Sequence, residues 1–110
     1  MMFIYSSMER ERERGEDKEW NFGLYLSGSN TRLSKRAIEN LNSICEEHLN
    51  GRYCLQIIDI EEYPQIGIDK NIIASPTLIR ESPVPVKRVI GDFSEREKAL
   101  VAVGIKKKSV

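Results

Sequence analysis

The chain has 110 residues, of which 17 are Lys or Arg and 17 are Asp or Glu, so its formal net charge is zero. A chain of this length forms one domain with a core of modest size. The neutral balance argues against nucleic acid as the main partner, because phosphate binding needs a surplus of basic side chains. No stretch reaches the roughly 20 apolar residues of a membrane span, and the first residues lack a signal-peptide pattern. We therefore expect a cytoplasmic protein that binds neither nucleic acid nor membrane.

Both ends of the chain are charged. Residues 9–19 alternate acidic and basic side chains and have no apolar face. Such a segment cannot bury enough apolar surface to offset its ordering entropy. We expect residues 1–18 to be a flexible leader, residues 19–105 to form the domain and residues 106–110 to be a basic tail. Met8, just ahead of the charge run, is a second position at which translation could begin.

The first half of the domain reads as a βαβ unit. Residues 20–26 alternate apolar and other side chains and predict a strand, and residues 27–30 end it as a loop. Apolar side chains then recur at helical spacing over 31–49. The next run, 53–60, is almost continuously apolar and rich in β-branched residues, as is typical of a buried strand. A strand, a helix and a second buried strand favour parallel pairing with a right-handed crossover.

The second half contains shorter elements. Pro64 opens a short helix within 64–74, and residues 77–80 and 86–90 predict two strands. Ser94 and Glu97 match a capping box, which predicts a helix from there to about Val103. The order β-α-β-α-β-β-α predicts an α/β fold, a four-stranded mixed sheet with helices on both faces, which is the thioredoxin-like topology.

The chemistry-bearing residues do not form a recognisable catalytic or metal site. Thioredoxin-like redox proteins carry C-x-x-C just after the first strand, but residues 27–32 contain no cysteine. Cys45 and Cys54 fall on the apolar face of the helix and at the start of a strand, where they fit as buried hydrophobic residues. A single histidine, His48, and two separate cysteines make no metal centre. We predict no catalytic residue and no cofactor; a thiol–disulfide oxidoreductase using Cys45 or Cys54 is the competing hypothesis.

Several stretches together identify a family resemblance. They are Leu-Tyr-Leu-Ser-Gly at 24–28, Gly-Arg-Tyr at 51–53, Ala-Ser-Pro-Thr-Leu at 74–78 and Val-Ile-Gly-Asp-Phe-Ser at 89–94. From Tyr25 to about Val103 the chain resembles the KaiB family, the small partner of the KaiC ATPase in the cyanobacterial circadian clock. The resemblance implies a non-enzymatic protein that binds a KaiC-type P-loop ATPase ring, in timing or in stress adaptation. It also implies competition with a sensor histidine kinase that carries a related domain.

The resemblance implies partner-binding positions, which are Arg36, Tyr53, Gln56, Ile73, Lys87 and Arg88. Arg36, Lys87 and Arg88 would face an acidic partner surface; the alternative is that they are ordinary solvated cations. The strand over 53–58, placed at the edge of the sheet, could accept a partner strand by β-augmentation.

The family is also metamorphic: one fold is thioredoxin-like, and the other rearranges the second half of the chain and forms dimers and tetramers. All four prolines lie in that half. The fold-switch candidates are Pro76, Pro83, Pro85, Gly91, Asp92 and Ala102. Pro76 occupies the position of the thioredoxin cis-proline, and Ala102 stands where the family often has a glycine, which favours the helical state. The alternatives are that the prolines only punctuate loops, or that the protein is a self-assembling structural one.

Overall fold

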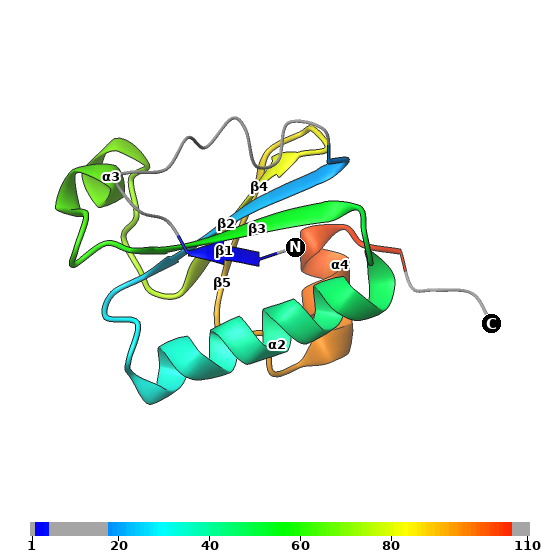
Figure 1. The fold of residues 1–110 in the computed structure, drawn as a ribbon, viewed down its shortest axis with the longest axis horizontal. Coiled ribbons are helices and arrows are strands. Elements are labelled where there is room, and N and C mark those ends of the chain that lie inside the picture. The colour runs from blue at the N-terminus through cyan, green and yellow to red at the C-terminus, as the bar shows by residue number, and fades with distance from the viewer. Residues whose placement is uncertain (1, 5–17, 107–110) are drawn as a thin grey trace.

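The computed structural model describes residues 2–4 and 18–106, and its central feature is a five-stranded mixed sheet in the order β1-β3-β2-β4-β5 (Figure 1). The predicted βαβ unit is present. It consists of β2 (Trp20–Leu26), α2 (Arg32–His48) and β3 (Tyr53–Asp59). β2 and β3 pair in parallel, in register from Trp20 opposite Tyr53 to Leu26 opposite Asp59.

The second half adds two antiparallel strands and two short helices. These elements are α3 (Pro64–Asp69), β4 (Thr77–Ser82), β5 (Lys87–Ile90) and α4 (Arg96–Val103). β4 pairs with β2 and β5 pairs with β4, both antiparallel. In Figure 1, α2 and α4 lie along one face of the sheet and α3 lies at the other. The expected α/β, thioredoxin-like arrangement with helices on both faces is confirmed.

A short strand, β1 (Met2–Ile4), is present within the segment expected to be a flexible leader. It pairs in parallel with the middle of β3, with Met2 opposite Leu55 and Ile4 opposite Ile57. Its three residues are apolar and precede the charge run, so β3 can supply backbone partners that an isolated segment lacks. Met1 and residues 5–17 of the predicted leader, and residues 107–110 of the predicted tail, lie outside the described residues. β1, and not β3, is therefore the edge strand over Leu55–Ile57.

Alternation along the strands divides the core between the two faces. The larger cluster joins the face carrying Phe22, Leu24 and Leu55 to α2 and α4. The smaller cluster joins Tyr25, Ile58 and Ile79 to the α3 side. This division follows from the period of two in strands, because successive side chains point to opposite faces.

The predicted capping box at Ser94 is wrong. α4 begins at Arg96, and its N-cap residue is Glu95, which makes no side-chain capping bond. The backbone N–H of Ser94 instead donates to the Asp92 carboxylate at 3.1 Å. Phe93 is buried with a φ of 61°, so the chain makes a turn before the helix and Ser94 belongs to that turn. Local pattern alone could not place the helix start, because burial of Phe93 decides it.

Candidate functional site: the β5–α4 junction and the surfaces around it

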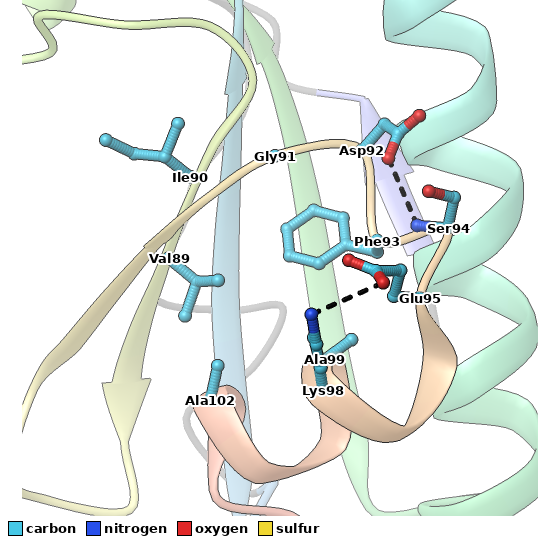
Figure 2. A pocket seen from close by; sticks show the side chains of 10 residues that line it. All are labelled: Val89, Ile90, Gly91, Asp92, Phe93, Ser94, Glu95, Lys98, Ala99 and Ala102. Carbon is cyan, nitrogen blue, oxygen red and sulfur yellow. Dashed lines mark hydrogen bonds and ion pairs between the residues drawn. The ribbon is translucent and has the colours of Figure 1, made fainter.

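An open groove of about 260 Å³ lies where β5 runs into α4. Its lining comes from residues 89–95 together with Lys98, Ala99 and Ala102. Figure 2 shows the Phe93 ring directed into the space between β5 and α4, whereas the Ile90 side chain points away from it. Three of the predicted fold-switch residues, Gly91, Asp92 and Ala102, line this groove. The structure thus gathers residues that the sequence places up to eleven positions apart.

Asp92 joins the groove to α2. Its carboxylate forms an ion pair with the Arg36 guanidinium at 3.2 Å. The Asn40 side chain donates to the Asp92 backbone carbonyl at 2.9 Å. The backbone N–H of Gly91 donates to the Pro76 carbonyl at 3.1 Å, which ties the same turn to the start of β4. Arg36 and Asp92, predicted for two different roles, therefore form one contact.

The electrostatics of the groove favour an ionised Asp92. Hydrogen bonds from the Ser94 hydroxyl and backbone N–H, helped by the nearby Arg36 guanidinium, lower the pKa of the Asp92 carboxyl. A carboxylate that accepts several hydrogen bonds is held in its charged form. Asp92 therefore acts as an anion that orders the turn, and part of the Arg36 charge is satisfied within the chain.

Arg80 is a buried charged residue of this region that the sequence analysis did not single out. It extends from β4, is only 5% exposed, and its two terminal nitrogens donate to the Val103 and Pro85 carbonyls, each at 2.7 Å. Its guanidinium lies 5.6 Å from the centre of the Trp20 ring. The cation thus connects the C-terminal end of α4, the β4–β5 loop and the start of β2. Strand alternation was the available signal, because it places Arg80 on the same face as Leu78.

The loop at the thioredoxin redox position is occupied by a carboxylate from β3. The backbone N–H groups of Gly28 and Ser29 donate to the two Asp59 oxygens at 3.1 and 2.9 Å. Partial burial opposes ionisation of Asp59, but the backbone N–H groups of Glu61, Ser29 and Gly28 outweigh it and lower the pKa of this carboxyl. The donors that would face a reactive group in a redox site are therefore used to close the loop.

The two thiols lie away from this loop and are buried. Cys45 faces the core from α2 and Cys54 lies on β3, and neither is in a disulfide. Burial raises the pKa of the Cys45 thiol to about 12. A thiol needs a lowered pKa and access to solvent to exchange with disulfides. The geometry therefore gives no support to the oxidoreductase hypothesis.

Two predicted partner-binding residues of β3 are not on an open surface. Tyr53 is only 1% exposed, and its hydroxyl donates to the Glu46 carboxylate. Burial and that hydrogen bond raise the pKa of Tyr53. Gln56 is half-buried and lies opposite Phe3 in the β1–β3 register. Tyr53 is therefore not available as a direct contact while the sheet is intact, whereas part of Gln56 is exposed.

The remaining predicted contacts are exposed but dispersed. Ile73, in the loop between α3 and β4, is 91% exposed. Lys87 and Arg88 are exposed neighbours on β5 and so point to opposite faces. Arg88 donates to the Lys70 and Asn71 carbonyls, which brings it beside the loop that carries Ile73. The structure therefore groups Arg88 with Ile73 and places Arg36 and Lys87 elsewhere.

The proline candidates connect to the same network. The bonds preceding Pro76, Pro83 and Pro85 are all cis, and the sequence analysis left the isomer at Pro76 open. The Pro76 carbonyl accepts a hydrogen bond from the Gly91 N–H, and the Pro85 carbonyl accepts one from the Arg80 guanidinium.

Among the described residues, no cluster of side chains suited to a metal ion is found. Nor does any helix in the described part of the chain have the length and apolarity to cross a membrane.

Comparison with known proteins is consistent with this arrangement. The KaiB domain family model matches residues 23–105. The circadian clock oscillator protein KaiB of Thermosynechococcus vestitus is 44% identical over 82 residues, which is 74% of this chain and 75% of that protein. The circadian clock protein KaiB3 of Synechocystis is 43% identical over 82 residues, covering 74% of this chain and 79% of the relative.

Solved structures are similar in fold at low sequence identity. The N-terminal domain of Synechococcus elongatus SasA has a TM-score of 0.63 and 15% identity, and the match covers 96% of this chain and 99% of that domain. Mitochondrial thioredoxin 3 of Saccharomyces cerevisiae has a TM-score of 0.67 and 14% identity, and covers 91% of this chain and 93% of its own. Both likenesses bear on the fold alone.

Proposed function

The chain belongs to the KaiB family of non-enzymatic clock proteins, and on that basis we propose that it is a cytoplasmic regulator that binds a KaiC-type P-loop ATPase ring. Binding would change the activity of the ring or the access of other partners to it, a competing sensor histidine kinase among them. The output would be clock-like timing or adaptation to stress.

One observation carries the proposal. The family match spans 23–105, which is nearly the whole described domain. Within that span the loop at the redox position holds serine and glycine closed on Asp59, and the thiols are buried. A thioredoxin-like domain without accessible thiols can still act by binding another protein through its surface. This supports a binding role.

The test is binding to a purified KaiC-type ATPase hexamer by size-exclusion chromatography with light scattering. We expect co-elution in at least one of the ATP- and ADP-bound states. Lys87→Glu should weaken binding by about tenfold, or ~1.4 kcal/mol. Lys35→Glu is the matched control, because Lys35 is an exposed cation of α2 outside the predicted contacts. Absence of co-elution in every nucleotide state would overturn the proposal.

We further propose that this chain can convert between the thioredoxin-like fold described above and a second, self-associating fold of the family, a dimer or tetramer. Support comes from the groove, where Gly91, Asp92 and Ala102 meet at the boundary between β5 and α4. Two packings of one chain can coexist when they differ by a few kcal/mol. Ala102 is exposed on α4, so its contribution to the helical state is its helix propensity.

Ala102→Gly should lower the stability of the thioredoxin-like state by about 1 kcal/mol. The equilibrium should then move toward the second fold, visible as a slowly exchanging second set of amide NMR signals and a larger mass by light scattering. Glu39→Gly, at an exposed position of α2 outside the converting half, is the control and should lower stability without new signals. A single set of signals in both variants would contradict the proposal.

A further inference from the structure

The two edges of the described sheet differ in how they are protected. At the β5 edge, Lys87 and Arg88 are exposed, and the loop leading into the strand contains Pro83 and Pro85. Charged residues and prolines are devices that keep an edge strand from pairing with another chain. The β5 edge is therefore protected by its own residues.

β3 lacks such devices. From Tyr53 to Ile58 it has no charged residue and no proline, and Gln56 is its one polar side chain apart from the buried tyrosine hydroxyl. The strand is seven residues long, and β2 pairs with only one of its sides. The uncharged stretch ends before Asp59, the last residue of the strand, and such a stretch is a template for pairing with a second chain where nothing covers its outer side.

β1 lies on that unprotected side. Met2, Phe3 and Ile4 pair with Leu55, Gln56 and Ile57, which are the central three residues of β3. Because β1 covers the middle of β3, no other strand can pair continuously along that side of β3. β1 is also short, so only a few backbone hydrogen bonds keep it paired with β3.

We propose that β1 is a guard strand: it covers the middle of β3 and thereby prevents two copies of this chain from pairing edge to edge through β3. Translation from Met8 would remove the guard, because β1 ends at Ile4. A chain that begins at Met8 would therefore be an unprotected form of the same domain.

A second copy fits this edge because β3 is complementary to itself. Antiparallel pairing about a two-fold axis at Gln56 places Leu55 opposite Ile57 and Cys54 opposite Ile58 of the other copy. Both pairs are apolar, and like charges do not meet opposite one another within 53–58. An interface in which the same strand serves both copies is the isologous arrangement of a two-fold dimer.

The experiment compares four chains by size-exclusion chromatography with light scattering over a wide concentration range. They are the full chain, a chain starting at Met8, the full-length triple variant Met2→Ser/Phe3→Gly/Ile4→Ser, and the control Ser6→Gly/Ser7→Gly. Hydrogen–deuterium exchange of the β3 amides is measured on each at low and high concentration. A peptide of residues 1–7 is also added in excess to the Met8 chain.

We expect the Met8 chain and the triple variant to dimerise with rising concentration, and the full chain and control not to do so through β3. Hydrogen–deuterium exchange of the β3 amides should be faster in the two variants at low protein concentration and slow again at high concentration. The peptide of residues 1–7 should return the Met8 chain to a monomer. Unchanged mass and β3 exchange in both variants would overturn the proposal, as would dimers without added β3 protection. Dimerisation of the Met8 chain but not of the triple variant would also overturn the proposal. Loss of cooperative unfolding in both variants would overturn it as well, because β1 would then be needed for the fold itself.

Discussion

At the scale of single residues, the buried cation of Arg80 is the most consequential feature of the second half of the chain. Its two terminal nitrogens are satisfied by the Val103 and Pro85 carbonyls, while its Nε has no hydrogen-bond partner among the described residues. A buried charge is costly unless it is well hydrogen-bonded. The α4 C-terminus and the Trp20 ring reduce that cost, because both present negative electrostatic potential to the guanidinium.

Arg80→Ala should lower the free energy of unfolding by about 3 kcal/mol, because it removes two charge-assisted hydrogen bonds from buried carbonyls. Arg88→Ala is the matched control: Arg88 also donates to two carbonyls, but from an exposed position. Its loss should cost less than about 1 kcal/mol. Urea unfolding at neutral pH measures both values. Equal costs for the two variants would show that burial does not strengthen the Arg80 contacts.

At the scale of elements, the C-terminal end of α4 is adjusted to the same arginine. Gly104 caps the helix with a φ of 87°, and its N–H donates to the Leu100 and Val101 carbonyls. A Cβ at this position would lie 2.5 Å from a terminal nitrogen of Arg80. Glycine is therefore required here twice, by the left-handed backbone and by the close approach of the cation.

Gly51 provides a matched comparison for Gly104→Ala. Gly51 also has a positive φ, 78°, but a Cβ there would meet nothing within 4 Å. Gly51→Ala should cost roughly 1–2 kcal/mol, the conformational cost alone. Gly104→Ala should cost at least about 1 kcal/mol more, because Arg80 must move from its carbonyls. In an Arg80→Ala background the excess should disappear, and an excess that persists would contradict the steric explanation.

At the scale of the whole molecule, two carboxylates join segments that are distant in the chain. Asp59 connects the end of β3 to the loop that precedes α2, and Asp92 connects the β5–α4 turn to α2 itself. Both groups have lowered pKa values in the folded protein. Each is therefore more readily protonated in the unfolded chain than in the native one.

Stability should consequently fall in acid. A carboxyl with a lowered pKa stabilises the fold fully above the pKa of the unfolded chain, about 3.8 for both groups, and that stabilisation is lost as the pH falls through the lower pKa of the folded state. Urea unfolding across that window should show a smaller loss in Asp59→Asn and in Asp92→Asn than in the unaltered chain. Glu62→Gln, at an exposed position, is the control and should leave the pH dependence unchanged. Identical profiles in all four proteins would contradict the assignment.

The sequence by itself determined the elements with strong periodicity. The strand at 20–26 and the buried strand at 53–60 were predicted within a residue or so of β2 and β3, and the helix at 31–49 within about one residue of α2. In these segments the apolar spacing and the flanking turn residues agree, so local preference and burial point to the same structure. The mixed arrangement of the four predicted strands, β2 to β5, and the helices on both faces follow from that order of elements, whereas β1 was not predicted.

Only the tertiary structure decided the features that depend on distant partners. β1 forms because β3 offers it a backbone partner, α4 starts late because Phe93 is buried, and Arg80 is buried because α4 presents carbonyls to it. The pairing of Arg36 with Asp92 likewise requires α2 to lie beside the β5–α4 turn. Sequence patterns report local preference over a few residues, whereas these contacts gain their free energy from segments that meet only after the sheet has formed.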